Sequence, residues 1–469
     1  MINKHFDKVH EECAVFGISI DTDEAVGITY NALLALQHRG QEGSGIAVAC
    51  DNSIFCHKNI GLASEVFCGK KLETIPKSYV AVGHNRYSTT GTNTIKNVQP
   101  VVTEYLTGRL ATVHNGNITN AKSLKETLKG WGVKFDATSD SEVISSLIAY
   151  YTVKYEDSLK GTIKAAEMLE GAYTLIVLCG NGKMIAVRDP NGYRPLCIGK
   201  NPHGCVVASE SCALDCCGFE FERDIKPGEV VLIEDGKITE ISSLKKEKED
   251  KAGLCIFEHV YFARPDSIID GLSVYDARFN MGKVLAEEYP VDADVVCGVP
   301  DSGLEAAAGY SAASGIPLAT GFIKNRYVGR SFIYPTQIQR ESVVHIKLNP
   351  LKVNIKDKKI VLVDDSIVRG TTSEKIVRTL KNAGAKEVHM RISSPPFRYA
   401  CYYGTDIDNE ENLIANKLAI EGICKQIGAD SLGYISIDGL KNACSQSQLP
   451  FCTKCFTGNV SDHRKNDLE

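Results

Sequence analysis

The chain has 469 residues, of which 43% are hydrophobic and 24% are charged, and its formal net charge is −5 at pH 7. This length exceeds one ordinary core, so we expect two or three domains. The slightly negative net charge gives no reason to expect nucleic acid or a membrane as a partner. No apolar run reaches the roughly 18 residues of a membrane span. Met1–Glu12 lacks the apolar core of an export signal, so a cytoplasmic protein is expected.

Strand-like runs dominate the first half of the chain. They are apolar, bounded by turn residues, and lie at Ala14–Ile20, Gly45–Ala49, Val80–Gly83, Leu110–His114, Tyr173–Cys179, Met184–Arg188, Val206–Ser209 and Glu229–Ile233. Helical periodicity appears at Val26–Leu36, Ser141–Tyr151 and Ser158–Leu169. Because strand runs follow one another directly, the sheets should be largely antiparallel, with helices packed on them.

The pattern changes after a charged stretch, Ser242–Ala252, which we interpret as the linker region. Beyond it, strands are predicted at Val295–Val299, Leu318–Phe322, Ile360–Val363 and Glu387–Ile392. Helices are predicted between them, at Ser302–Ala313 and Ser373–Ala383. This alternation of strand and helix favours a parallel, doubly wound sheet.

Cys13 opens the first predicted strand, where a buried core cysteine is the simplest interpretation. Three other segments favour a chemical role. Each ends an apolar strand with polar residues and glycines, and they are QHRGQEGSGI (Gln37–Ile46), GHNRYSTTG (Gly83–Gly91) and HNGNI (His114–Ile118). Amide hydrolysis needs a nucleophile, a base and donors for an oxyanion. No His/Asp partner is evident near Cys13, but a free α-amine, with a pKa of roughly 7.7–8, would serve as the base if Cys13 became residue one.

These segments resemble the glutaminase domain of the class II (N-terminal-nucleophile) glutamine amidotransferases, an α-β-β-α sandwich. The resemblance implies that Cys13 attacks the glutamine carboxamide, that Arg86 holds the α-carboxylate and that Asp140 holds the α-amine. It further implies an oxyanion hole at Asn115 and Gly116. The residue types suit these roles, because a guanidinium binds a carboxylate and amide N–H groups bind an oxyanion. Taken singly, they would be a surface ion pair, a turn and a helix N-cap.

The most specific motif is VLVDDSIVRGTTSEKI, Val361–Ile376. An apolar strand ends in two adjacent acids, and a turn rich in Gly and Thr then opens a helix. Backbone N–H groups at a helix start bind phosphate, while paired acids suit ribose hydroxyls or Mg²⁺. An exposed strand-to-helix turn is the alternative, but two adjacent like charges are costly there without a ligand or cation.

The motif resembles the phosphoribosyl-pyrophosphate (PRPP) signature of type I phosphoribosyltransferases. The resemblance implies that Asp364 and Asp365 contact the ribose. The residues that would wrap the 5′-phosphate are Arg369, Gly370, Thr371 and Thr372. A second segment, GVPDSG, resembles the loop that takes the pyrophosphate and Mg²⁺, through Asp301, Ser302 and Gly303. We expect one Mg²⁺ per subunit, at Ser302, Asp364 and Asp365.

Between these motifs lies a basic, aromatic segment, Ile323–Ser342, which fits a lid closing over a polyanion. Its candidate cations are Lys324, Arg326 and Arg330, each of which is alternatively an ordinary solvated charge.

Together the two halves resemble the glutamine PRPP amidotransferase (amidophosphoribosyltransferase) family, which opens purine biosynthesis. The implied reaction converts glutamine, PRPP and water to 5-phosphoribosylamine, glutamate and pyrophosphate, with ammonia passing between the sites. The implied domains are a propeptide at 1–12, a glutaminase at 13–245 and a phosphoribosyltransferase at 246–458, followed by a tail at 459–469. A homotetramer inhibited by purine nucleotides is also implied.

Seventeen cysteines in a long chain without an export signal do not suggest a disulfide scaffold. Cys452 and Cys455 form a CxxC pair near the C-terminus, and Cys255 and Cys401 lie far upstream. Their spacing leaves zinc, an iron–sulfur cluster, a redox pair and idle buried thiols open.

One branch of the resembled family carries a [4Fe–4S] cluster and a cleaved propeptide. That resemblance implies one cluster per subunit on Cys255, Cys401, Cys452 and Cys455. Cys216, Cys217 and Cys444 remain unassigned, and Cys444, close to the CxxC, is the first alternative ligand.

Two other functions compete with an amidophosphoribosyltransferase. A class II amidotransferase that makes an amino sugar or asparagine is disfavoured by the phosphoribosyl motif. A PRPP- or nucleotide-sensing regulator without activity is disfavoured by the intact Cys13 constellation. A DNA-binding regulator would also need a basic domain, which this chain lacks.

Overall fold

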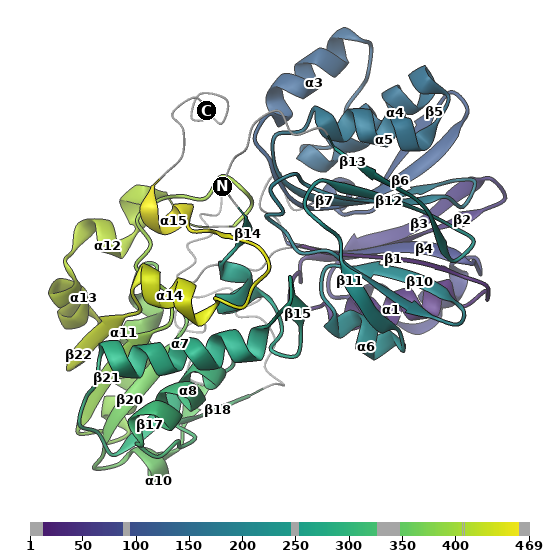
Figure 1. Ribbon diagram of the computed structural model, residues 1–469. Coiled ribbons are helices and arrows are strands. Elements are labelled where there is room, and N and C mark those ends of the chain that lie inside the picture. The colour runs from purple at the N-terminus through teal and green to yellow at the C-terminus, as the bar shows by residue number, and fades with distance from the viewer. Residues whose placement is uncertain are drawn as a thin grey trace.

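The structure is a computed structural model that describes residues 13–87, 94–244, 253–325, 348–405, 407 and 409–458. These residues form two halves that lie side by side (Figure 1). The first half, coloured purple to teal, contains two large antiparallel sheets, and the second, coloured green to yellow, contains a parallel sheet. No helix in these ranges is both long enough and apolar enough to cross a membrane.

The two sheets of the first half stack face to face. The seven-stranded sheet contains β1 (Ala14–Ile20), β2 (Gly43–Cys50), β3 (Ser53–Ile60), β4 (Val80–Arg86), β9 (Cys197–Asn201), β10 (Gly204–Ala208) and β11 (Glu220–Asp224). The six-stranded sheet contains β5 (Val101–Tyr105), β6 (Gly108–Ile118), β7 (Gly171–Cys179), β8 (Met184–Arg188), β12 (Glu229–Glu234) and β13 (Lys237–Ser243). Their orders are β11-β9-β10-β1-β4-β2-β3 and β13-β12-β8-β7-β6-β5.

Apolar side chains fill the three interfaces between the four layers of this half. Val15, Val82, Val113 and Ile176 belong to the core between the sheets. The outer face of the seven-stranded sheet packs against α1 (Ala25–Ala35) and α6 (Cys212–Cys217). The outer face of the six-stranded sheet packs against α3 (Ala121–Gly130), α4 (Asp140–Tyr155) and α5 (Ser158–Glu167). The predicted α-β-β-α sandwich is therefore confirmed.

The parallel sheet of the second half has the order β17-β20-β21-β22. Its strands are β17 (Val295–Gly298), β20 (Lys359–Asp364), β21 (Glu387–Ile392) and β22 (Ser431–Tyr434). Leu318 makes an isolated parallel bridge to Val296 of β17, which also pairs with β20. The chain therefore reverses its winding direction between β17 and β20, and ligands of doubly wound sheets bind at such a switch point.

Helices cover both faces of the parallel sheet. One face packs against α7 (Val274–Glu288), α8 (Leu304–Ser314) and α14 (Ile437–Ala443). The other packs against α11 (Thr371–Asn382) and α13 (Ile420–Ile427). This arrangement confirms the predicted doubly wound sheet.

The predicted strand at Leu318–Phe322 is wrong in extent. Val296 exchanges backbone hydrogen bonds with Pro317 and Ala319, and the chain then leaves β17. The next strand, β18 (Phe322–Lys324), pairs antiparallel with β19 (Leu348–Pro350) instead. The predicted linker also begins too early, since Ser242 and Ser243 belong to β13, while residues 245–252 lie outside the described ranges.

Candidate active sites and a cysteine pocket

Cys13 lies immediately before β1, at the end of the sheet where β4 finishes. Ala14 is the register partner of Asn85 on β4, which brings the end of β4 and Tyr87 beside Cys13. The Cys13 thiol donates to the backbone carbonyl of Tyr87 at 3.3 Å, and the backbone N–H of Tyr87 approaches the same sulfur at 3.4 Å. The thiol is therefore held against the backbone that follows Arg86.

Arg86 is the last residue of β4, opposite Gly43 of β2, and is 3% exposed. Burial lowers its pKa, and the nearby Cys13, Glu42 and Asp140 oppose that shift. The guanidinium thus lies in the electrostatic neighbourhood of both the thiol and Asp140. A cation in this position suits the carboxylate of a small substrate.

Asn115 and Gly116 lie near the end of β6 in the facing sheet. Gly116 has φ +136°, and a Cβ on it would lie 2.1 Å from the carbonyl oxygen of Ala172, so the position requires glycine. Asn115 is 1% exposed, and no described group hydrogen-bonds to its Nδ2. A buried N–H without a partner is costly, and a substrate oxygen would satisfy it.

Asp140 is the first residue of α4 and is 7% exposed. Its Oδ2 accepts from the backbone N–H of Ile118 at 3.2 Å, and its Oδ1 lies 3.8 Å from His114 Nδ1. These contacts tie Asp140 to the strand that carries Asn115. The N-cap position belongs to Ser139, so Asp140 is not the capping residue of this helix.

The loop that follows α1 contributes a residue that sequence reasoning missed. A Cβ on Gly40 would lie 2.6 Å from the backbone oxygen of Asn85, which explains the glycine of QHRGQ by close approach. The adjacent Arg39 is fully buried and donates from Nε to the carbonyl of Cys13 at 3.2 Å. The sequence does place this arginine in the segment Gln37–Ile46. Its burial and its hydrogen-bond partners, however, depend on residues far away in the chain.

In the second half, two loops meet at the switch point between β17 and β20. Asp364 and Asp365 are both fully buried at the end of β20. The Ser302 hydroxyl, from the loop after β17, donates to Asp365 Oδ1 at 2.6 Å, and the Ser366 hydroxyl donates to Oδ2 at 2.5 Å. A Cβ on Gly303 would lie 2.3 Å from the carbonyl oxygen of Val363, which explains this glycine.

The start of α11, which follows these two acids, has a glycine at its N-cap, so a ligand could approach the backbone closely. Gly370 caps α11 with φ +89°, a left-handed conformation that favours glycine, and the helix begins at Thr371. Arg369 and Thr372 flank this turn. The N-terminal backbone amides of α11 provide donors for an anion such as a phosphate.

Of the three predicted lid cations, only Lys324 lies within the residues that the structure describes. Lys324 forms an ion pair with Asp301, from the loop after β17. Arg326 and Arg330 lie outside the residues that the structure describes.

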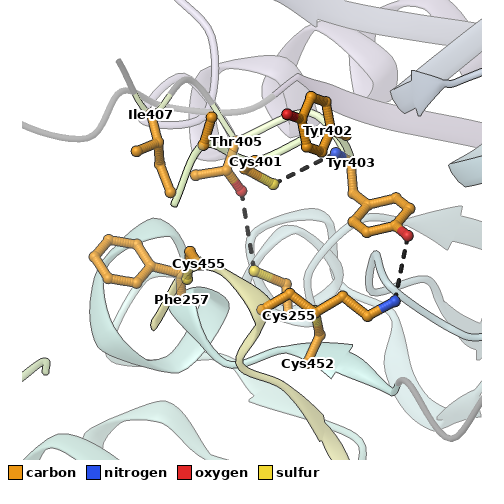
Figure 2. A pocket seen from close by; sticks show the side chains of 11 residues that line it. Cys255, Phe257, Cys401, Tyr402, Tyr403, Thr405, Ile407, Cys452 and Cys455 are labelled. Carbon is orange, nitrogen blue, oxygen red and sulfur yellow. Dashed lines mark hydrogen bonds between the residues drawn. The ribbon is translucent and has the colours of Figure 1, made fainter. Parts of the chain in front are cut away.

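Four cysteines from three distant segments line one pocket (Figure 2). Parallel pairing of β14 (Leu254–Cys255) with β23 (Phe451–Cys452) sets Cys255 opposite Cys452, and α15 (Lys454–Thr457) supplies Cys455. Cys401 lies across the pocket from Cys255 and Cys455, and its sulfur accepts from the backbone N–H of Tyr403 at 3.4 Å.

Burial raises the pKa of Cys455 well above its usual value, and Cys255, Cys401 and Cys452 raise it further. Four thiolates would therefore be stable together only with cationic metal between them. Within the described residues, no group of three or more Cys, His, Asp or Glu side chains converges on a single ion.

The remaining unassigned cysteines lie elsewhere. Cys444 belongs to the apolar core on the α7 side of the parallel sheet and does not line the pocket, so the structure does not support it as an alternative ligand. Cys216 and Cys217 belong to α6 in the first half.

Comparison with known proteins agrees with both halves. A family model described as a glutamine amidotransferase domain matches residues 84–216, and one described as a phosphoribosyl transferase domain matches residues 270–393. Amidophosphoribosyltransferases of Synechocystis sp. and Archaeoglobus fulgidus are 48% and 47% identical to the chain. The alignments cover 97% and 95% of this chain and 92% and 97% of those proteins. The chain belongs to the amidophosphoribosyltransferase family.

A solved structure of this family shares the whole architecture. The glutamine PRPP amidotransferase of B. subtilis, complexed with ADP and GMP, matches with a TM-score of 0.87 at 44% identity, over 96% of this chain and 97% of that one. The predicted function, a glutamine-dependent amidophosphoribosyltransferase at the first step of purine biosynthesis, is therefore confirmed. An amino-sugar or asparagine synthase is not supported, because the phosphoribosyl half is matched as well.

Proposed function

We propose that Cys13 is the nucleophile that releases ammonia from glutamine. Arg86 holds the substrate α-carboxylate and Asp140 its α-amine. The Nδ2 of Asn115 and the backbone N–H of Gly116 stabilise the oxyanion. The observation that carries this proposal is the buried Nδ2 of Asn115, which has no described partner and stands beside a position where only glycine fits.

The chemistry follows from these groups. The Cys13 sulfur attacks the carboxamide carbon while its proton passes to the free α-amine of the same residue. The intermediate collapses to a thioester, and the proton goes to the departing ammonia. Water then hydrolyses the thioester to glutamate and restores the thiol. The α-amine is available only after removal of residues 1–12, which we propose to be a propeptide.

The ammonia then attacks C1 of PRPP in the second half. Asp364 and Asp365 bind the ribose hydroxyls, and the turn formed by Arg369, Gly370, Thr371 and Thr372 binds the 5′-phosphate. The loop formed by Asp301, Ser302 and Gly303 faces the pyrophosphate, and Lys324, Arg326 and Arg330 close over it as a lid. These groups act through position and charge rather than as acids or bases.

One Mg²⁺ per subunit fits this site. Its ligands would be Ser302, Asp364 and Asp365, and the 2.6 Å contact between Ser302 and Asp365 supports this by bringing hard oxygen donors of both loops together. A bound Mg²⁺ would supply positive charge to offset the charge of the leaving pyrophosphate.

The cysteine pocket fits one [4Fe–4S] cluster per subunit, held by Cys255, Cys401, Cys452 and Cys455. Four cysteines line this pocket, and three of them raise the pKa of the fourth, Cys455, which supports a metal centre held by four thiolates. Iron and zinc analysis distinguishes the cluster from a zinc ion. The cluster would tie the C-terminal segment, through Cys452 and Cys455, to Cys255 and Cys401 elsewhere in the second half. We accordingly place this chain in the cluster-bearing, propeptide-containing branch of its family.

The wider organisation is proposed by analogy. The domains would span 13–245 and 246–458, followed by a tail at 459–469, and four subunits would assemble. Purine nucleotides would inhibit the enzyme, as the ADP and GMP in the B. subtilis complex suggest for that relative.

The test is a PRPP-dependent glutaminase assay on anaerobically purified protein, with mass spectrometry and iron and sulfide analysis of the same sample. We expect a chain that begins at Cys13, glutamine hydrolysis stimulated by PRPP, and about four irons per chain. Efficient glutamine hydrolysis by a chain that retains Met1–Glu12 would exclude the α-amine as base. Stoichiometric zinc would exclude the cluster.

A further inference from the structure

A single buried guanidinium joins the nucleophile to the phosphoribosyl half. While Nε of Arg39 donates to the carbonyl of Cys13, its Nη1 and Nη2 donate to Glu258 Oε2 and Oε1 at 3.0 and 2.9 Å. Nη1 also donates to Glu210 Oε1 at 2.6 Å. Glu210 belongs to the first half, whereas Glu258 begins a short helix of the second half, Glu258–Phe262.

The charges in this contact are mutually dependent. Arg39 and Glu258 are fully buried and Glu210 is 1% exposed, so none of the three is screened by water. His38 also contacts Glu210, at 2.7 Å, and Arg194 lies 3.6 Å from Glu258. Loss of the Glu258 charge would leave Arg39 with an incomplete set of buried partners, and such groups rearrange.

Glu258 is in turn connected to the PRPP site. Arg278 of α7 donates from Nε to the carbonyl of His259 at 2.9 Å and from Nη2 to the carbonyl of Ala263 at 2.7 Å, which fixes both ends of the Glu258 helix. Its Nη1 lies 3.8 Å from Glu305, in the first turn of α8.

The pKa of Arg278 is also influenced by acidic residues at and near the proposed PRPP site. Burial lowers its pKa, and the charges of Glu305 and then Asp365 oppose this shift. The α8 helix itself begins directly after Gly303 of the candidate pyrophosphate loop.

We propose that Arg278, Glu258 and Arg39 form a buried relay that adjusts the position of Cys13 to the state of the PRPP site. Glu258 is a positioning residue in this relay, since it acts on Cys13 through Arg39. A change at the start of α8, next to the candidate pyrophosphate loop, shifts Arg278 through Glu305 and with it the Glu258 helix. Arg39 transmits that shift to the Cys13 carbonyl. The relay rests on the proposed role of Cys13 as nucleophile.

The chain offers a matched control. Arg188 of β8 forms a similar buried bidentate ion pair with Asp270 of the second half. Its Nη1 and Nη2 donate to Asp270 Oδ1 and Oδ2 at 2.8 and 2.7 Å. This pair joins the same two halves, and in the described residues it makes no contact with Cys13 or Arg39. Its nearest approach to the relay is the backbone carbonyl of Arg194, to which Arg188 donates. Glu258→Gln and Asp270→Asn therefore each remove one buried carboxylate charge from an inter-half contact, and only the first lies on the relay.

The experiment compares both variants of the full chain with the unsubstituted enzyme, with and without PRPP and Mg²⁺. It measures kcat and KM for glutamine, the rate of Cys13 alkylation by iodoacetamide, and synthesis from ammonia. We expect Glu258→Gln to reduce the PRPP stimulation of glutamine hydrolysis by roughly 5- to 150-fold, the usual range of coupling between sites. Its alkylation rate should become insensitive to PRPP, with ammonia-dependent synthesis retained. Asp270→Asn should keep the PRPP response.

Three results from the single variants would overturn the relay. These are a normal PRPP response in Glu258→Gln, an equal loss in Asp270→Asn, or a loss of iron in Glu258→Gln, which would assign the effect to nearby Cys255. Arg278→Lys combined with Glu258→Gln should be no worse than the more severe single change, and additive losses would also contradict it. Failure of the Cys13 proposal is separable, because Cys13→Ala would then still use glutamine.

Discussion

The two active sites are assembled in different ways. The proposed glutaminase site draws Cys13, Arg86, Asn115 and Asp140 from two sheets and a helix, and its glycines allow backbones to approach closely. The proposed phosphoribosyl site lies on two loops that follow adjacent parallel strands, joined by the hydrogen bond from Ser302 to Asp365. A site made from neighbouring strand ends is recognisable from one local motif. A site made from distant segments is recognisable only when several motifs are found together.

The two sites should also fail differently. Damage to the glutaminase site should remove the use of glutamine alone, because ammonia supplied in solution reaches the second half directly. Damage to the phosphoribosyl site should remove synthesis from either nitrogen source. The predictions below test that separation.

The largest effect is expected for Cys13→Ala. Loss of the nucleophile should lower glutamine-dependent synthesis by roughly 10³-fold or more, while synthesis from ammonia is retained. Assays with each nitrogen source measure this, and Cys68→Ala, at an exposed cysteine, is the control. Loss of both activities in Cys13→Ala would show that the sites are not separable.

Asp365→Asn should affect both nitrogen sources. Its carboxylate accepts from the hydroxyls of Ser302 and Ser366, and the neutral amide removes the charge that the ribose and cation require. We expect synthesis to fall by roughly 10²- to 10³-fold with glutamine and with ammonia alike. Asp292→Asn, at a side chain that is 97% exposed, should leave both rates unchanged. A loss confined to glutamine would contradict the assignment.

Asn115→Ala should lower the kcat of glutamine hydrolysis by roughly 10²-fold, because one oxyanion donor is lost. KM for glutamine should change much less, since the donor acts mainly on the transition state. Steady-state kinetics distinguish the two effects, with Asn181→Ala in an exposed turn as the control. A change in KM alone would make Asn115 a substrate-binding residue instead.

The smallest effect concerns stability. Burial lowers the pKa of His84, on β4 beside the glutaminase site, to about 3. In the unfolded chain the imidazole takes up its proton near pH ~6.5, so between these values the unfolded state binds more protons. The contribution of His84 is therefore present above pH ~6.5 and is lost as the pH falls, by about 1 kcal/mol per pH unit.

Denaturant unfolding from pH 7 to pH 4 measures this slope. The free energy of unfolding should fall less steeply in His84→Gln than in the unsubstituted chain. His203→Gln, whose side chain is 61% exposed, should keep the original slope. Equal slopes in all three proteins would mean that folding does not lower the pKa of His84.

Strand prediction succeeded where backbone pairing and side-chain pattern agree. β1, β8 and β21 have the predicted bounds because their apolar runs end at turn residues. The segment around Leu318 failed, since its backbone leaves β17 after one bridge and β18 pairs with β19. α7 was missed, although its buried Val274, Ala277, Met281 and Leu285 follow helical spacing.

The sequence by itself determined which residue types occur in which motifs, and these predict two sites, a doubly wound sheet and a sandwich. The tertiary structure alone decided which buried charges meet. Arg39 and Glu258 are 219 positions apart, and neither stands in a motif that predicts the other. Their contact depends on how the two halves pack, because a buried guanidinium needs acceptors, and those of Arg39 come from segments far apart in the chain.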